Sequence, residues 1–216
     1  MQFQAIMALI AISSIAIYLT SNIRPLDIVF QTVSAISTTG ANVPTTNAMA
    51  IWPSFTLLII CILMLIGGSS GSTVGSIEVI RVITFLKGIN STVINQLSPE
   101  GRVLSVKIGG KTIRDKEIKE SSAYIALFML FIFLGWLVML MYGYEPLQSF
   151  FNVISAQGNN GVWIGSAVSD IPDEVKYMLI GNMWIGRLEI IPVLVLFRSL
   201  YETLKRVPME IKNSIK

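Results

Sequence analysis

The distribution of hydrophobic positions along the chain predicts a membrane protein built from helices. Residues 1–23 and 121–144 contain no charged residue, and each stretch is long enough for a helix that crosses a bilayer. Two further stretches, 51–66 and about 175–201, are also apolar enough to be membrane helices. We therefore expect an all-α integral membrane protein whose first spanning helix covers about residues 3–20.

Two other stretches match each other without a gap. Residues 25–40 read PLDIVFQTVSAISTTG and residues 146–161 read PLQSFFNVISAQGNNG, so that corresponding residues differ by 121 in number. Both begin with Pro-Leu, contain Ser-Ala and end in glycine. Proline is favourable at the first position of a helix, where its missing N–H group costs nothing. Each stretch therefore predicts a helix of about 12 residues that leads into a polar, glycine-ended segment.

A helix of this length is too short to cross a bilayer, which indicates a re-entrant pore loop. The negative end of such a helix points to the place where a cation can sit, and the carbonyl and hydroxyl groups that follow can replace its hydration shell. We expect Ser21 or Asn22 to cap the first of these helices. Glu145 lies in the favourable field at the start of the second.

Residues 67–76, GGSSGSTVGS, interrupt the apolar stretch that begins at residue 51 and are here called the Gly/Ser segment. Glycine and serine in this number disfavour a helix, and we expect helical structure to resume at Ile77 and to run to about Lys87. Non-helical backbone at membrane depth occurs where it is buried in protein or lines water. A movable gate fits this position, and a close-packed kink of small residues is the alternative. A phosphate-binding loop does not fit, because Gly-Lys-Ser/Thr is missing.

The remaining parts of the chain are polar. Residues 88–120 form a linker, in which the alternation of residues 102–108 predicts a strand of a small hairpin. A second spanning helix follows from Asp115 to about Tyr142. Residues 169–174 form an acidic turn before the final helix, and residues 202–216 form a basic, amphipathic tail.

Composition narrows the functional class. With 53% hydrophobic and 13% charged residues, the chain is not a soluble domain. It contains no histidine and a single cysteine, Cys61, which excludes a disulfide framework and leaves almost no ligands for zinc or haem. The net charge of +3 is not a nucleic-acid signature, because the basic residues are sorted by membrane side and do not form a patch.

The charges also predict the orientation in the membrane. Of the sixteen lysines and arginines, all but three lie on the side of the linker and the tail; Arg24 and Lys176 lie on the side of the pore loops, and Arg187 lies within a helix. By the positive-inside rule, the linker and the C-terminus are cytoplasmic and the pore loops are extracytoplasmic. The protein is then a multi-pass protein of the inner (plasma) membrane, in contact with the lipid bilayer.

Taken together, these motifs resemble the Trk/Ktr/HKT superfamily of potassium transporters, in particular its Trk-type members. The resemblance covers nearly the whole chain and is carried by residues 34–40, 67–78, 106–111, 155–161 and 186–189. The order of a spanning helix (M1), a pore helix with its loop (P) and a second spanning helix (M2) occurs twice in the sequence, and we expect two parallel repeats whose loops enter from the same face. The resemblance implies that such units surround one pseudo-symmetric pore. Family members have four such units, and this sequence resembles the third and fourth.

The resemblance assigns residues 1–90 to one M1–P–M2 unit, 91–120 to the cytoplasmic linker and 121–216 to the other unit with its tail. It implies potassium uptake, with K⁺ as the transported ion and no other cofactor. It also implies partners: the missing first two units (in the same chain or in a partner chain), a homodimer of complete pores and a cytosolic nucleotide-binding regulatory subunit.

The candidate site residues fall into two groups. The selectivity filter is expected at Ser37, Thr38, Thr39, Gly40, Gly158, Asn159, Asn160 and Gly161, with K⁺ at Thr38, Thr39, Asn159 and Asn160. Whether side chains or carbonyl groups coordinate the ion is left open. The gate is expected at Gly67, Gly68, Ser69, Ser70, Gly71, Ser72, Thr73, Gly75 and Arg187.

Arg187 is the one charged residue expected near the middle of the bilayer. A charge at that depth costs at least about 2.5–3.5 kcal/mol, so it is expected to face the interior of the protein with a partner. We expect Arg187 to project into the pore beneath the filter, as an electrostatic barrier and as an anchor for the Gly/Ser segment. A purely structural buried arginine is the alternative.

Three other functions are alternatives to potassium uptake. The first is a half-subunit, non-conducting or permeable to sodium, that needs a partner half for activity. A membrane-embedded assembly or anchoring subunit is a second rival. A membrane enzyme is disfavoured, because the chain has no histidine, no paired intramembrane carboxylates and no nucleophile site.

Overall fold

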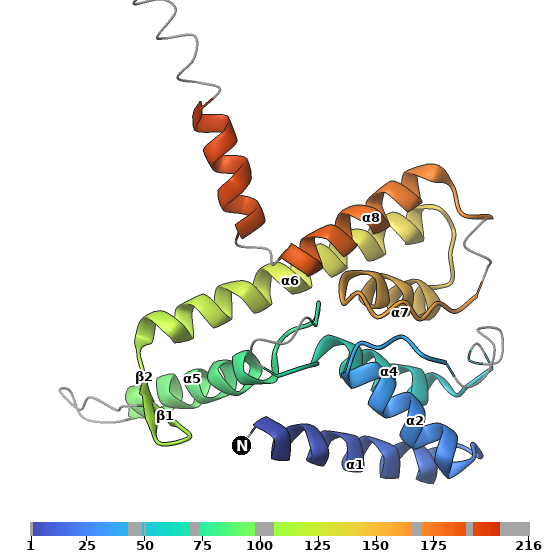
Figure 1. Cartoon of the computed structure of the whole chain (residues 1–216), viewed down its shortest axis with the longest axis horizontal. Helices are drawn as coiled ribbons and strands as arrows, with labels where there is room; N and C mark the ends of the chain where they lie inside the picture. The colour runs from blue at the N-terminus through green and yellow to red at the C-terminus, as the bar shows by residue number, and fades with distance from the viewer. Residues whose placement is uncertain are drawn as a thin grey trace, which may run out of the picture.

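The computed structural model describes residues 2–42, 49, 51–69, 74–97, 106–165, 170–188 and 192–203. Over these residues the fold is helical, with one two-stranded hairpin (Figure 1). Its elements are α1 (Gln2–Thr20), α2 (Pro25–Ile36), α4 (Ser54–Leu65), α5 (Val79–Leu97), β1 (Val106–Ile108), β2 (Lys111–Ile113), α6 (Asp115–Met141), α7 (Pro146–Gln157) and α8 (Asp173–Leu188). A further helix covers Pro192–Thr203.

Two of the described helices, α1 and α6, are long and apolar enough to cross a membrane. They have 19 and 27 residues, and their mean hydropathies are 1.9 and 2.5. A third span exists if α8 and the helix Pro192–Thr203 form one crossing, with a bend of 103° between them. The sequence predicted one final helix from 175 to 201; the described residues instead form two helices on either side of residues 189–191.

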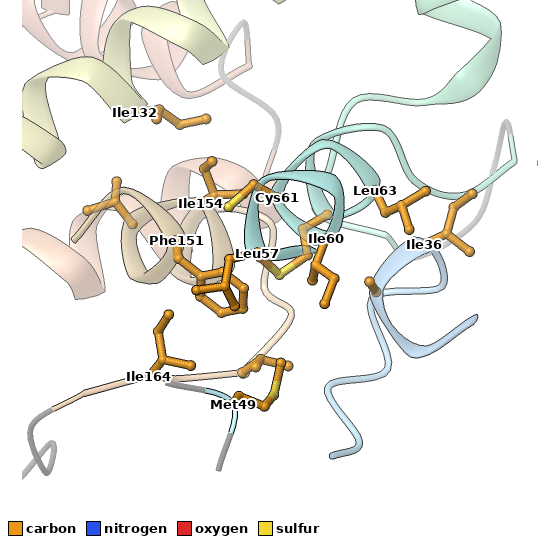
Figure 2. Close-up of a cluster of buried hydrophobic side chains, with 14 of the residues drawn as sticks. Ile36, Met49, Leu57, Ile60, Cys61, Leu63, Ile132, Phe151, Ile154 and Ile164 are labelled. Atoms are coloured by element: carbon orange, nitrogen blue, oxygen red, sulfur yellow. The ribbon is translucent and has the colours of Figure 1, made fainter. Parts of the chain in front are cut away.

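The helices form two groups that meet at α4. In the first group, α1 and α2 pack against each other and both contact α4; in the second, α6, α7 and α8 pack against one another. Helix α4 also packs against α7, so it contacts both short helices (Figure 1). Figure 2 shows this junction, where Leu57, Ile60 and Cys61 of α4 lie beside Phe151 and Ile154 of α7.

Helix α5 differs from its predicted length. It continues to Leu97, ten residues beyond Lys87, and therefore extends into the stretch assigned to the linker. Its C-terminal half, from Gly88 onward, packs against α6. Gly88 lies so close to Ile118 that a Cβ atom on the glycine would be 2.5 Å from the isoleucine Cγ2. Packing against α6 thus extends a helix that the polar sequence did not predict.

The linker ends in the expected hairpin. Strands β1 and β2 are antiparallel, with Val106 opposite Ile113 and Ile108 opposite Lys111. The turn between them uses Gly109 and Gly110 at φ of 56° and 83°, in the left-handed region that glycine enters without strain. The Lys87 ammonium group donates a hydrogen bond of 2.7 Å to the Lys107 carbonyl, which fixes the hairpin to α5. Residues 102–105 of the predicted strand lie outside the described part of the chain.

Candidate functional site

The two short helices end in the same way. The N–H groups of Thr38 and Asn159 donate to the carbonyls of Ala35 and Ala156, at 3.3 and 3.0 Å. The N–H groups of the next residues, Thr39 and Asn160, donate to the carbonyls of Ser34 and Ser155, at 3.1 and 2.9 Å. Every donor and acceptor in one set corresponds to its counterpart in the other at an offset of 121.

The backbone conformation repeats as well. Thr38 and Asn159 have φ angles of 49° and 53°, and two residues later Gly40 and Gly161 have φ angles of 75° and 84°. Residues other than glycine rarely adopt positive φ, because it costs roughly 1–2 kcal/mol. Thr38 and Asn159 are the only described non-glycine residues that do so. The matched strain indicates that the same backbone shape is required at both places.

The starts of the two helices differ from the prediction in one respect. Arg24 occupies the N-cap of α2 and makes no side-chain capping bond, so neither Ser21 nor Asn22 caps this helix. Ser21 instead donates to the Ile17 carbonyl at 2.6 Å, as part of the end of α1. Glu145 is the N-cap of α7, where its carboxylate accepts a hydrogen bond of 3.2 Å from the Gln148 N–H group. The short α1–α2 connection explains the difference for Ser21, whose N–H and hydroxyl groups both bond to the Ile17 carbonyl at the end of α1.

Buried polar side chains of the two helices hold the returning chain. Asn152 makes two hydrogen bonds to the backbone of Ile164, as acceptor from its N–H at 2.9 Å and as donor to its carbonyl at 2.8 Å. Ser34 donates to the Ala41 carbonyl at 2.7 Å. Sequence reasoning missed the role of Asn152; the available signal was an amide residue in the middle of a short helix, between the apolar residues Phe151 and Val153.

Three of the four polar residues that the sequence assigned to K⁺ form side-chain hydrogen bonds within the protein. Asn159 Nδ2 donates to the Met183 carbonyl of α8 at 3.0 Å, and Asn160 Nδ2 lies 3.4 Å from the Ala35 carbonyl. The hydroxyl of Thr39 bonds to that of Ser37 at 2.7 Å. Both amide groups thus hold the loops against neighbouring helices, and the predicted coordination of K⁺ at these residues stays a prediction.

The structure brings the two predicted filter segments, residues 37–40 and 158–161, into contact. Gly40 lies directly against the Asn160 carbonyl group, so closely that no Cβ atom would fit between them. The Asn160 side chain reaches the Ala35 carbonyl of the other segment's helix. Two stretches separated by 121 residues in the sequence therefore form one oxygen-rich site, at the carbonyl ends of α2 and α7.

The Gly/Ser segment begins and ends beside this site. The Gly67 N–H group donates to the Ile77 carbonyl at 3.2 Å and the Ile77 N–H group to the Leu65 carbonyl at 2.9 Å, which closes the segment at its base. The Gly68 N–H group donates to the Ile36 carbonyl, the last of α2, at 3.2 Å. Of the predicted gate residues, Ser70, Gly71, Ser72 and Thr73 lie outside the described residues.

Each end of the segment touches the C-terminal end of one short helix, α2 or α7. A Cβ atom on Gly67 would lie 2.7 Å from the Ile36 carbonyl oxygen, and one on Gly75 would lie 2.8 Å from the Gly158 carbonyl oxygen. Only glycine permits this backbone approach. The described part of the Gly/Ser segment therefore lies against the negative ends of both short helices.

Arg187 lies on the last turn of α8 and is exposed in this chain. Its neighbour Gly186 is buried against the Gln157 carbonyl, the last of α7, at a distance that leaves no room for a Cβ atom. Arg187 is therefore next to a residue in direct contact with the site. Its predicted roles as barrier and anchor stay predictions.

Comparison with known proteins adds the following findings. The sequence profile of a cation transport protein family, TrkH, matches residues 4–206. An uncharacterized cation transporter of Methanocaldococcus jannaschii is 35% identical over 191 residues, which is 88% of this chain and 40% of the relative. The Trk system potassium uptake protein TrkH of Halomonas elongata is 31% identical over 196 residues, which is 88% of this chain and 40% of the relative.

The fold is also similar to a solved structure. The crystal structure of the potassium transporter TrkH from Vibrio parahaemolyticus superposes with a TM-score of 0.76 at 25% sequence identity, over 90% of this chain and 43% of that one. The chain thus spans about two fifths of the length of these curated relatives. The relatives are named as transporters, in agreement with the expectation that this chain is not an enzyme.

Proposed function

This chain belongs to the TrkH family of cation transport proteins, and from this premise we propose that it supplies two of the four filter segments of a potassium pathway. The contact between Gly40 and the Asn160 carbonyl carries the proposal, because it joins two loops of the same backbone shape edge to edge. Carbonyl groups arranged in this way can replace the hydration shell of a monovalent cation. The carbonyl ends of α2 and α7 add a favourable field.

Internal symmetry supports a closed arrangement of four units. Gly40 is covered by the second loop, whereas no heavy atom of the described residues lies within 4 Å of the Cβ position of its counterpart Gly161. A further loop, related to the second as the second is to the first, would cover Gly161. This chain therefore has one joined edge and one open edge at the filter.

The same relation holds for the helices. Helix α4 follows Pro53 and α8 follows Pro172, an offset of 119. At this offset, the α4 residues buried at the junction with α7 correspond to α8 residues that line an open groove: Leu57, Ile60, Cys61 and Met64 correspond to Lys176, Leu179, Ile180 and Met183. Helix α8 thus presents the face with which α4 binds a pore helix.

Helix α2 presents the complementary face. Its groove is lined in part by Phe30 and Val33, which are 46% and 42% exposed, whereas their counterparts Phe151 and Ile154 are 0% and 1% exposed beneath α4. An M2 helix of another unit would cover this face as α4 covers α7. The four-unit pore, supplied by the same chain or by a partner chain, is therefore the assembly in which both faces are buried.

In the proposed pathway, K⁺ loses water at residues 37–40 and 158–161 and then meets the Gly/Ser segment as the gate. Arg187 acts below the filter as an electrostatic barrier and anchor. The pore loops face the outside of the cell membrane, and the hairpin and C-terminal tail face the cytoplasm. A homodimer of complete pores and a cytosolic nucleotide-binding subunit are partners that the resemblance implies.

A chimera tests this function. It is the M. jannaschii relative in which this chain replaces the portion that it matches, 40% of the relative's length. In cells that lack potassium uptake, the chimera is expected to restore growth at low potassium and to take up Rb⁺, whereas the chain alone is not. Membrane insertion of the chimera without cation uptake would contradict the proposal, and uptake of Na⁺ in preference to Rb⁺ would support the sodium-permeable alternative.

A further inference from the structure

We propose that the Asn159 carboxamide is a positioning group that couples the Gly/Ser segment to the filter and to α8. This inference rests on the proposed function, because it assigns a role to a contact between its filter and its gate. In it, the side chain of Asn159 does not coordinate the ion. The Asn159 backbone remains part of the filter.

The first observation is the hydrogen bonding of Asn159. Its Nδ2 atom donates to the Met183 carbonyl of α8 at 3.0 Å and lies 3.4 Å from the Gln157 carbonyl. With φ at 53°, the backbone turns immediately after α7 and directs this side chain at α8. The carboxamide thus links the inner end of the second filter segment to an M2 helix.

The second observation is the packing around the same nitrogen. A Cβ atom on Gly75 would lie 2.8 Å from Asn159 Nδ2, and one on Gly186 would lie 3.2 Å from it. Gly75 belongs to the end of the Gly/Ser segment, and Gly186 belongs to α8. Asn159 is therefore wedged between the segment that is proposed to move and the helix that holds the second pore loop in place.

The third observation is the difference between the two units. Thr38, the counterpart of Asn159, places its methyl group 3.5 Å from the Cβ position of Gly67, within its own unit. Asn159 instead meets Gly75, which comes from the M2 stretch of the other unit. The contact crosses from one unit to the next, and it does so where the Gly/Ser segment rejoins helix-forming sequence.

These contacts have a mechanical consequence. Any displacement of the segment away from the filter separates Gly75 from Asn159 and from the Gly158 carbonyl. A hydrogen bond that holds Asn159 in this position contributes about 1 kcal/mol, which corresponds to roughly a fivefold change in an equilibrium. Removal of the carboxamide should therefore favour the displaced segment by about that factor.

The test measures the accessibility of the segment in the full chain in lipid vesicles. Ser69 is exposed and is replaced by cysteine as a reporter, while the native Cys61 is buried and serves as the unreactive background. We expect Asn159→Gly and Asn159→Asp each to raise the rate at which a thiol reagent modifies the reporter about fivefold. Asn159→Asp retains the shape of the side chain but presents a carboxylate oxygen to the Met183 carbonyl in place of the N–H donor. It therefore breaks the hydrogen bond without the added flexibility of glycine.

Asn160→Ala is the matched control. It removes a carboxamide at the next position, whose donated bond goes to Ala35 and not to α8. We expect it to leave the modification rate within twofold. Unchanged rates in both Asn159 variants, or an equal increase in Asn160→Ala, would overturn the inference.

A second arm separates coupling from ion coordination. In the chimera, Asn159→Gly is expected to raise the maximal Rb⁺ uptake rate and to leave the half-saturating concentration and the preference over Na⁺ unchanged. A weaker half-saturation or a lost preference would assign the side chain to the ion and overturn the inference. If the unmutated chimera does not transport, the proposed function fails, and the accessibility experiment alone decides whether the coupling exists.

Discussion

Gly40 lies directly against the backbone carbonyl group of Asn160, and this contact joins the two predicted filter segments, residues 37–40 and 158–161. It is made by backbone alone, and it requires both the absence of a Cβ atom and a φ of 75° at Gly40. Its counterpart Gly161 has the same left-handed conformation and an open surface. The pair therefore allows a matched comparison. Gly40 is needed both for its left-handed backbone conformation and for its lack of a Cβ atom, whereas Gly161 is needed for its backbone conformation alone.

Gly40→Ala should strongly destabilise the chain. The alanine would be strained in the left-handed backbone conformation and would also overlap the Asn160 oxygen, which together lower the free energy of unfolding by roughly 2–5 kcal/mol. In Gly161→Ala only the backbone strain applies, and the loss is about 1–2 kcal/mol. Thermal unfolding in detergent, followed by loss of the monodisperse fraction, should rank Gly40→Ala well below Gly161→Ala. Equal midpoints would argue that the two segments are not in contact.

The two glycines of α8 give a second matched pair. Gly186 is buried against the Gln157 carbonyl, whereas Gly181 has nothing within 4 Å of its Cβ position. Gly186→Ala should cost about 1–3 kcal/mol or more, because it forces α7 and α8 apart. Gly181→Ala should be neutral or stabilising by up to about 1 kcal/mol through helix propensity. The same unfolding assay checks both, and a neutral Gly186→Ala would show that the helices can separate at no cost.

Asn152 should be essential for the second pore loop. Replacement by leucine conserves the approximate volume but leaves the buried N–H and carbonyl groups of Ile164 without their partner, which costs roughly 2–4 kcal/mol. Gln31→Leu, at the corresponding position of the first unit, removes one longer hydrogen bond to a half-buried side chain and should cost less than half as much. A similar loss of thermal stability in both variants would contradict this assignment.

Arg187 can be tested separately from stability. In the chimera, Arg187→Ala should raise the uptake of Rb⁺, because it removes the barrier charge below the filter, and Arg187→Lys should retain most of the native rate. The initial rate of Rb⁺ uptake, normalised to the amount of protein in the membrane, is the measurement. Unchanged uptake in Arg187→Ala would remove the proposed role and leave a structural arginine.

Local sequence rules predicted some boundaries well and others poorly. The 12-residue helices at Pro25–Ile36 and Pro146–Gln157 were predicted because proline marks their starts and a polar, glycine-ended segment follows. The cap at Ser21 or Asn22 was wrong because Arg24 is the N-cap residue of α2 and Ser21 bonds to the end of α1. The predicted end of α5, Lys87, was ten residues too early. Packing against α6, which local composition does not report, stabilises the last turns of the helix up to Leu97.

The glycine of residues 67–76 that corresponds to Gly186 differs between the sequence alignment and the structure. Residues 75–78 read GSIE and residues 186–189 read GRLE, and the alignment of these two motifs pairs Gly75 with Gly186. In the structure it is Gly67 that packs on the last carbonyl of its own pore helix, as Gly186 does, while Gly75 packs on the Gly158 carbonyl of the other unit. The Gly/Ser segment therefore lies between two glycine contacts, one within its unit and one across to the next.

The sequence by itself determined that the chain is a helical membrane protein and that residues 25–40 and 146–161 share one backbone design, because hydrophobic length, proline and glycine act locally. The tertiary structure decided which groups meet: Gly40 with Asn160, Gly75 with Asn159, and Asn152 with Ile164. These contacts depend on backbone approach and on the direction of side chains across 12 or more residues. No local pattern encodes such distances, because they result from how α4, α7 and α8 pack around the two loops.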